Sequence, residues 1–281
     1  MARRPQCVAQ PVRDRRRWRQ PDHAGGARRQ VRPDLRAARQ GQGRLSDARR
    51  IADDPRRDQS RLREAQEGQA VTAAHPYKLV IFDFDGTLSD SGDWFISILD
   101  DLADRFRFRR VERAEIETLR RRPTREVIQH LRIPGWRLPL IARHVRARFR
   151  DSASEIRTFD GVRAMLQSLA EAGIRMVLCS SNAETNVRAV LGPDAARFEA
   201  YFCGSGLFGK VAKFRRVIRT SGLPPAAILA IGDETRDIDA ARAVGVGAGA
   251  ALWGYANPDT LIAMGPDKAF ATPEEIVAYL A

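Results

Sequence analysis

Residues 78–88 read Lys-Leu-Val-Ile-Phe-Asp-Phe-Asp-Gly-Thr-Leu, and this stretch decides the fold. It begins as a short apolar run and ends on two aspartates, Asp83 and Asp85, followed by Gly86. A short apolar run bounded by glycine is typical of a strand buried in a parallel sheet. We therefore expect the folded part of the chain to begin here, with both carboxylates at the carboxyl end of its first strand.

Toward the C-terminus, from Gly161 onward, helical and strand-like patterns alternate. The pattern predicts strands at 174–179, 227–231 and 246–252, and helices at 162–172, 183–191, 210–221 and 235–244. Alternation of this kind indicates a parallel sheet with helices on both faces. We therefore predict an α/β fold whose core is a three-layer, Rossmann-like parallel sheet.

Between the first strand and this alternating region, the sequence contains helical patterns and no convincing strand. We interpret residues 93–156 as a small helical cap inserted into the core, which would then consist of residues 77–92 and 157–281. Residues 1–76 differ in character, because they are rich in Arg, Gln, Pro and Gly and show no sustained apolar period. Such a segment cannot bury enough apolar surface to offset its ordering entropy. We expect a disordered, Arg-rich extension, with a transient helix near 58–67, and its composition raises the suspicion of untranslated upstream sequence.

The net charge of the chain is +13, which at first suggests a nucleic-acid partner. Residues 1–76, however, contain 19 arginines, no lysine and nine acidic residues, and so carry +10 of this charge. The predicted globular part is nearly neutral, and no basic face is implied for it. We expect nucleic acid to bind at most weakly and non-specifically, through the extension.

Other features exclude several further classes of protein. No uncharged apolar stretch reaches the roughly 18 residues that a membrane span requires, and the N-terminus lacks the apolar core of a secretory signal. Cys7, Cys179 and Cys203 form no CxxC pair, and the four histidines lie far apart, so neither a disulfide framework nor a zinc site is indicated. We expect a cytoplasmic protein without a membrane partner.

Asp83 and Asp85 stand two residues apart, and alternate side chains of a strand point to the same side. Ligands of open parallel sheets bind beyond the carboxyl ends of the strands, where these carboxylates would lie. Gly86 allows a sharp turn there, and the hydroxyl of Thr87 can tie that turn to neighbouring loops. An ordinary turn is the alternative, because turns also favour Asp and Gly.

The string Asp83-Phe84-Asp85-Gly86-Thr87-Leu88 resembles the first motif of the haloacid dehalogenase-like superfamily. Counterparts of that family's other three motifs follow in order. Ser180, after the predicted strand 174–179, matches the second motif. Either Lys210 or Lys213 matches the third, and Lys210 is preferred because it follows Gly209 at the mouth of its helix. The string Gly232-Asp233-Glu234-Thr235-Arg236-Asp237 matches the fourth.

Together these motifs would bring four carboxylates to one site: Asp83, Asp85, Asp233 and Asp237. Each pair of like charges about 4 Å apart costs about 4 kcal/mol at an effective dielectric constant of about 20, so a cation is required. Oxygen ligands favour Mg²⁺. The resemblance implies that Mg²⁺ binds the Asp83 and Asp233 side chains and the backbone carbonyl of Asp85, while Asp237 orients the site from outside the ligand set.

The resemblance also implies a phosphatase that acts on a small phosphorylated metabolite. Asp83 would be the nucleophile, Asp85 the general acid and base, and Ser180, the Ser181 N–H and Lys210 would bind the phosphoryl group. An acid at position 85 favours phosphoryl transfer, because dehalogenating members of the family lack it. The cap resembles that of the phosphoglycolate phosphatase-like branch.

Two details of this branch concern substrate contacts. Arginines in the cap, Arg121, Arg122 and Arg125, are candidates to hold an anionic leaving group. The segment 253–255, Trp-Gly-Tyr, also resembles a loop of this branch, but it is interpreted as core aromatics without a role in the site.

Three rival functions remain open at this point. A phosphomutase of the same family would use the same residues, a nucleic-acid-binding protein would act through the extension, and a catalytically idle scaffold would need none of the motif residues.

Overall fold

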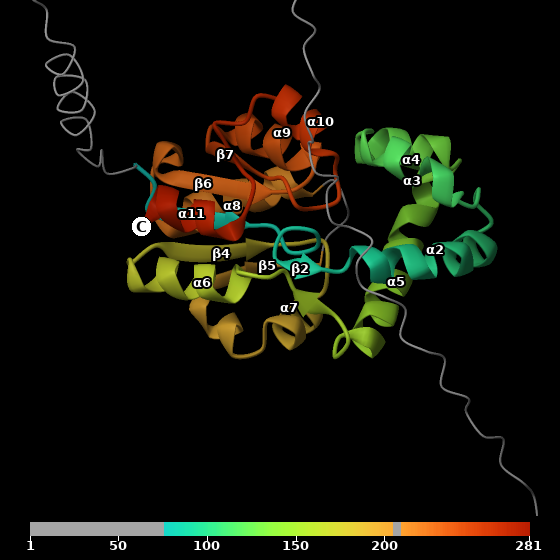
Figure 1. The fold of residues 1–281 in the computed structure, drawn as a ribbon, viewed down its shortest axis with the longest axis horizontal. Helices are drawn as coiled ribbons and strands as arrows, with labels where there is room; N and C mark the ends of the chain where they lie inside the picture. The colour runs from blue at the N-terminus through green and yellow to red at the C-terminus, as the bar shows by residue number, and fades with distance from the viewer. Residues whose placement is uncertain (1–75, 205–208) are drawn as a thin grey trace, which may run out of the picture. The chain divides into compact units, whose positions relative to one another are not determined.

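The computed structural model describes residues 76–204 and 209–281. At its centre is a six-stranded parallel sheet with the strand order β5-β4-β1-β6-β7-β8 (Figure 1). The strands are β1 (Leu79–Phe82), β4 (Arg175–Cys179), β5 (Ala200–Phe202), β6 (Ile228–Gly232), β7 (Gly247–Ala251) and β8 (Lys268–Phe270). The first strand that the sequence predicts, in the apolar run 78–84, is therefore β1, and it lies in the interior of the sheet between β4 and β6.

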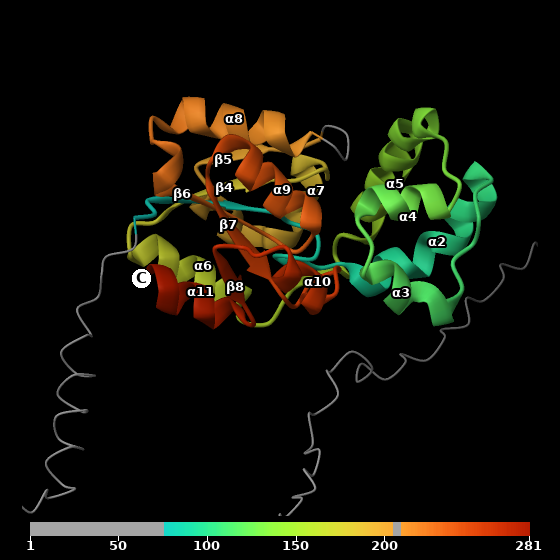
Figure 2. The same cartoon turned by 90° about the horizontal axis from the view of Figure 1, so that it is seen from above.

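Helices cover both faces of the sheet, which confirms the predicted three-layer α/β core. Leu79 and Ile81 pack toward α8 (Lys210–Ser221) and α9 (Thr235–Val244), whereas Val80 and Phe82 pack toward α6 (Val162–Glu171) and α11 (Pro273–Leu280). Successive side chains of β1 thus enter opposite layers, as the pleat of a strand requires. Figure 2 shows the sheet between α8 on one side and α6 and α11 on the other.

The described core contains further helices. They are α7 (Glu184–Leu191), α10 (Pro258–Ala263) and the 3₁₀ helices η3 (Gly192–Arg197) and η4 (Pro225–Ala227). No helix among the described residues is both long and apolar enough to cross a bilayer.

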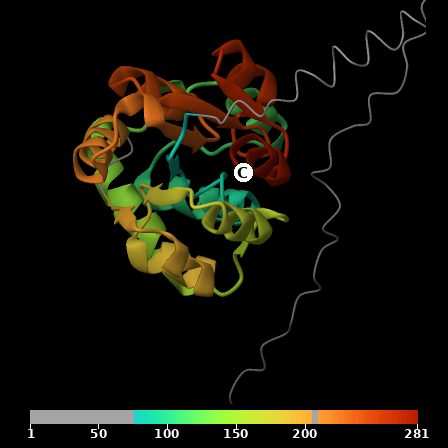
Figure 3. The same cartoon turned by 90° about the vertical axis from the view of Figure 1, so that its left-hand side faces the viewer.

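The segment between β1 and α6 is helical, as its sequence pattern predicts. It contains α2 (Gly92–Phe106), η1 (Arg113–Glu115), α3 (Ile116–Arg120), α4 (Thr124–His130), η2 (Gly135–Arg137) and α5 (Leu138–Ser152). This helical body lies beside the sheet in Figure 1 and behind it in Figure 3. Two short antiparallel strands, β2 (Ser89–Asp90) and β3 (Arg157–Thr158), pair where the chain leaves and re-enters the core.

An aromatic cluster joins the helical body to the core. Phe149 of α5 is almost fully buried, and its ring centroid lies 4.9 Å from that of Trp94 and 6.2 Å from that of Phe84, which follows β1. Aromatic rings at these separations attract one another beyond the gain from burial. The helical body is thus anchored next to the two aspartates.

Some elements differ from the sequence-based expectation. The strands β2, β3, β5 and β8 have two or three residues each, too few to show a period of two, and none was predicted. The expected extension at 1–76, with its helix near 58–67, lies outside the described residues apart from Pro76.

Candidate active site

The register of the central strands places Asp83 and Asp233 side by side. Phe82 of β1 is paired with Ile231 of β6, and the N–H of Asp83 donates a hydrogen bond of 2.9 Å to the carbonyl of Ile231. Both aspartates therefore leave the sheet at the same edge, and both are buried, with 5% and 0% of their surface exposed. Asp237 joins them from the first turn of α9.

These three carboxylates form a cluster whose oxygen atoms all lie within 4.8 Å of one another. Lys210, the first residue of α8, reaches into it: its Nζ donates to Asp83 Oδ2 at 2.5 Å and also to Asp237 Oδ1. The Nζ of Lys213 instead donates to the backbone carbonyl of Ser180. Of the two candidate lysines, the structure thus places Lys210 against the carboxylates.

Asp233 is held by its neighbours through both carboxylate oxygens. The hydroxyl of Thr87 donates to Oδ1 at 2.7 Å, which is the tie between turn and loop that the sequence suggested, and the N–H of Tyr255 donates to Oδ2 at 2.8 Å. Gly86, at φ +82°, lies so close that a Cβ there would be 2.2 Å from Asp233 Oδ2. The glycine of the first motif is therefore required both for its backbone conformation and for space.

Burial makes the ionised form of Asp233 unfavourable. Its pKa is raised, first because it is removed from solvent and then because Glu234 and Asp83 carry charge of the same sign. A bound cation would offset this cost. The ligand atoms that the cluster offers to a metal ion are carboxylate oxygens, which fit a hard divalent cation such as Mg²⁺.

Asp85, which the sequence motifs placed with the other three carboxylates, is not part of this cluster and has a different environment. Its Oδ1 accepts a hydrogen bond of 3.1 Å from Ser91 Oγ, and Nδ2 of Asn182 lies 3.3 and 3.4 Å from its two oxygens. The Ser180 hydroxyl lies 3.5 Å from Oδ2. Burial, and next the charge of Asp83, raise the pKa of Asp85 to about 7.

The two serines of the expected phosphate site follow β4. Ser180 is buried, and its Oγ accepts a hydrogen bond of 2.9 Å from the N–H of Asn182. Ser181 is half-buried, and its carbonyl accepts a hydrogen bond of 3.1 Å from Arg146 of α5. The first lies at the site itself, and the second contacts the helical body.

The helical body touches the core around the site. Arg120 of α3 donates to the carbonyls of Tyr255 and Gly254 at 2.8 and 3.1 Å, and Thr124 of α4 donates to Glu234. Among the three arginines that the sequence singled out, Arg121 also contacts the core. Arg121 forms an ion pair with Asp259 across 3.7 Å, and all three are exposed: Arg121, Arg122 and Arg125.

Several residues of the site were missed by sequence reasoning. The segment 253–255 was assigned no role, yet Tyr255 contacts Asp233 through its N–H, and its hydroxyl forms a hydrogen bond of 2.6 Å with Ser91. The available signal in the sequence was Gly254 between two aromatic residues. In the structure a glycine is required there, because a Cβ would lie 2.2 Å from Asp233 Cβ. Asn182 was missed because nothing local distinguishes it from a loop asparagine.

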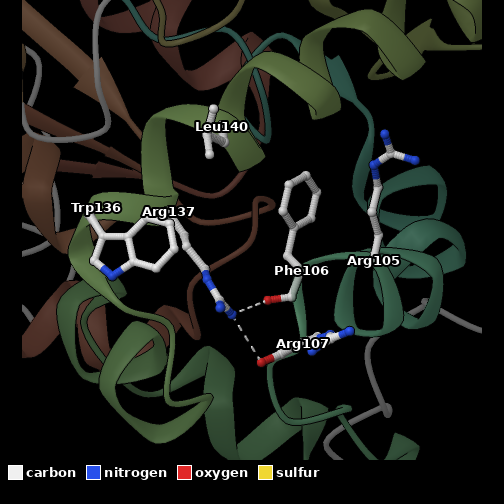
Figure 4. Close-up of a pocket in the computed structure, with 6 residues that line it drawn as sticks. All are labelled: Arg105, Phe106, Arg107, Trp136, Arg137 and Leu140. Atoms are coloured by element: carbon white, nitrogen blue, oxygen red, sulfur yellow. Dashed lines mark hydrogen bonds between the residues drawn. The ribbon is translucent and has the colours of Figure 1, made fainter.

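A separate cavity of about 250 Å³ lies on the helical body and contains none of the candidate site residues (Figure 4). Arg137 lines it and donates to the carbonyls of Phe106 and Arg107 at 2.5 and 3.4 Å. The other lining residues are Arg105, Trp136 and Leu140. Trp136 is 68% exposed, so the cavity is open to solvent and is unlike the buried carboxylate cluster.

Comparisons with known proteins identify relatives of this chain. The family model described as haloacid dehalogenase-like hydrolase matches residues 80–251, which span all four motifs. A phosphoglycolate phosphatase of Synechococcus elongatus is 30% identical over 200 residues, and this match covers 70% of the present chain and 94% of the relative.

Solved structures share the fold. A haloacid dehalogenase-like hydrolase from Streptococcus pneumoniae superposes with a TM-score of 0.61 at 17% identity, over 73% of this chain and 99% of that one. CbbY from Rhodobacter sphaeroides, solved in complex with phosphate, gives a TM-score of 0.58 at 19% identity over the same shares of the two chains. At these identities the likeness concerns the fold alone, and it extends over both the sheet and the helical body.

Proposed function

We propose that this chain hydrolyses a small phosphomonoester through an aspartyl-phosphate intermediate on Asp83. The chain belongs to the haloacid dehalogenase-like hydrolase family and is a phosphatase. The observation that carries this proposal is the cluster of Asp83, Asp233 and Asp237 with Lys210 at the carboxyl ends of β1 and β6. Phosphoryl transfer needs mainly positioning and charge neutralisation, and this arrangement can provide both.

Mg²⁺ is the cofactor that we propose for this cluster. Its protein ligands would be the side chains of Asp83 and Asp233 and the backbone carbonyl of Asp85. Asp237 would stay outside the ligand set, because its two oxygens accept hydrogen bonds from Lys210 and from the N–H of Glu234. When bound, the ion supplies positive charge that lowers the repulsion between the carboxylates and a phosphate.

In the first half-reaction a carboxylate oxygen of Asp83 attacks phosphorus, and the bond between phosphorus and the leaving oxygen breaks. Lys210 holds the attacking carboxylate in place and faces the phosphoryl oxygens. The Ser180 hydroxyl and the Ser181 N–H donate to the same oxygens.

Asp85 is proposed to handle the protons. Its raised pKa of about 7 allows it to hold a proton at neutral pH and to donate it to the leaving oxygen. The resulting carboxylate then takes a proton from the water that hydrolyses the aspartyl-phosphate, which restores both aspartates.

We further propose that residues 93–156 act as a cap that limits the site to small substrates. The contacts of Arg120, Thr124 and Arg146 with core loops support this division.

The phosphoglycolate phosphatase among the relatives makes 2-phosphoglycolate the first substrate to test. A reducing, cytoplasmic location agrees with the thiols of Cys179 and Cys203, both of which are free.

The test is phosphate release from a panel of phosphomonoesters, including p-nitrophenyl phosphate and 2-phosphoglycolate, with Mg²⁺ and with excess chelator. We expect turnover only with the metal. Asp83→Asn, a nearly isosteric neutral change, should abolish turnover while the protein keeps its fold, as checked by circular dichroism. Full activity in chelator would refute the metal assignment, and more than a few per cent of activity in Asp83→Asn would refute the nucleophile.

A further inference from the structure

Two buried asparagines connect Asp85 to the cap. Nδ2 of Asn182 lies 3.3 Å from Asp85 Oδ1, Oδ1 of Asn182 accepts a hydrogen bond of 2.9 Å from Nδ2 of Asn186, and Nδ2 of Asn186 also donates to the backbone carbonyl of Arg146 at 2.8 Å. Arg146 belongs to α5, and the asparagines precede and open α7, so this chain of hydrogen bonds crosses from the core to the cap.

Backbone groups fix the orientation of both amides. The N–H of Ala183 donates to the Asn182 side chain at 2.9 Å, and because an N–H can only donate, the atom facing it is Oδ1. Nδ2 of Asn182 therefore faces Asp85. In Asn186 the atom facing the Arg146 carbonyl must likewise be the nitrogen, because a carbonyl can only accept.

The asparagines are buried, with 5% and 2% of their surface exposed, so their polar atoms depend on these partners. The side chain of Asn182 does not cap α7, whose N-cap is Ala183. What the amide of Asn186 adds is a donor that reaches the cap and a second donor that orients Asn182.

We propose that Asn182 and Asn186 are positioning residues for Asp85, and that the Arg146 carbonyl of the cap completes their alignment. With the cap in contact, Asn186 holds Asn182, and Asn182 holds the Asp85 carboxyl toward the leaving oxygen. Arg146 contacts the core in two ways. Its backbone carbonyl accepts a hydrogen bond from Asn186, and its guanidinium donates one to the carbonyl of Ser181. The inference rests on the proposed role of Asp85 in proton transfer.

The test uses the dependence of the rate on the leaving group. A p-nitrophenolate leaving group departs without a proton, whereas an alkoxide needs one. Rapid-quench measurement of the first turnover at saturating substrate is made with p-nitrophenyl phosphate and with the alkyl phosphate that the wild type turns over fastest. The variants are Asn182→Ala, which removes the donor to Asp85, and Asn186→Leu, which removes the link to the cap.

We expect the alkyl ester rate to fall roughly tenfold to a hundredfold in Asn182→Ala, the size of effect that a misplaced catalytic group produces, and by a smaller factor in Asn186→Leu. The p-nitrophenyl phosphate rate should stay within about twofold, and so should both KM values from steady-state assays. Asn182→Ser, which retains a hydroxyl donor, should recover part of the loss. If Asn186→Leu does not fold, Asn182→Ala and Asn182→Ser still test the proposal, because their side chains are smaller than that of asparagine.

Asn257→Ala is the matched control, because Asn257 is also an asparagine that accepts a backbone N–H, but at the start of α10 and without contact to Asp85. It should lower the melting temperature and affect both esters equally. Equal losses on both esters in Asn182→Ala, or no loss on either, would overturn the positioning role. Absence of turnover in the wild type would instead refute the proposed function itself.

Discussion

Asp85 illustrates, at the scale of the residue, how a group suited to catalysis can oppose stability. Its pKa is 3.8 in an ordinary environment and about 7 in the folded protein, so the folded state binds this proton more tightly than the unfolded chain. The contribution of Asp85 to the free energy of unfolding is therefore largest below its ordinary pKa, falls as the pH rises from about 4 to about 7, and stays low above that. The cause is burial and, second, the charge of Asp83.

Asp85→Asn should for this reason stabilise the protein at alkaline pH. An amide cannot ionise, so in chelator the variant should melt at a higher temperature than the wild type at pH 8 and at a similar temperature at pH 4. The difference between a pKa of 3.8 and one of about 7 sets an upper limit of about 4 kcal/mol on the gain. Melting curves at both pH values measure it, and an equal or lower melting temperature at pH 8 would contradict the raised pKa.

Lys210 and Lys213 offer a second test with a built-in comparison. Lys210→Met leaves Asp83 and Asp237 without their buried cation, so we expect turnover to fall by about 10²–10³, the effect of removing one donor from a charged transition state. Lys213→Met removes a contact to a neutral carbonyl and should cost about tenfold or less. Steady-state kinetics with p-nitrophenyl phosphate decide, and a larger loss in Lys213→Met would reverse the assignment.

At the scale of the element, the loop between β7 and α10 packs on the carboxylates. A Cβ at Gly254 would lie 2.2 Å from Asp233 Cβ and 2.4 Å from the carbonyl oxygen of Gly86, and these atoms have no flexible end that can move away. Trp253 adds a hydrogen bond of 3.0 Å from its indole N–H to the carbonyl of Thr87. The loop thereby contacts both the turn that follows β1 and the aspartate that follows β6.

Gly254→Ala should therefore damage both stability and the metal site. We expect overpacking to lower the free energy of unfolding by about 1–3 kcal/mol. We also expect half-maximal activity to require a higher Mg²⁺ concentration. Gly135→Ala is the matched control, because a Cβ at Gly135 would meet nothing within 4 Å beyond its chain neighbours, and it should leave both quantities unchanged. A normal Mg²⁺ dependence in Gly254→Ala would show that the loop does not shape the site.

At the scale of the whole molecule, the positive charge and the chemistry lie in different parts of the chain. Residues 1–76 carry most of the net charge, whereas every candidate site residue lies beyond them. We expect deletion of residues 1–75 to leave kcat, KM and the melting temperature almost unchanged, because this segment supplies no motif residue and few apolar side chains. Lost phosphatase activity after the deletion would show that the segment contributes to the folded enzyme.

The same deletion separates the enzyme from a nucleic-acid-binding protein. Any binding of DNA or RNA by the full chain should disappear with the segment, show no sequence preference and weaken steeply between about 50 and 200 mM salt, since it would depend on counterion release. Binding that resists salt and selects a sequence would make nucleic acid a specific partner.

Local sequence was sufficient for the strands β1, β4, β6 and β7 and for the carboxylates of the site, but not for the short strands β5 and β8 or the helices α10 and α11. The apolar run before Asp83 and the run before Asp233 became the neighbouring strands β1 and β6, because a buried strand and the turn that ends it are encoded by adjacent residues. The helix at 210–221 also has the bounds that were predicted.

Packing between distant segments decided the rest. Which lysine meets the carboxylates depends on how α8 is rotated against β1, and the hydrogen bond from Lys210 to Asp83 joins residues 127 positions apart. The contacts of Asn182 with Asp85 and of Asn186 with Arg146 likewise join separate elements, so no local period marks them. Such partners are selected by the free energy of the assembled core, in which a buried polar group must find its acceptor.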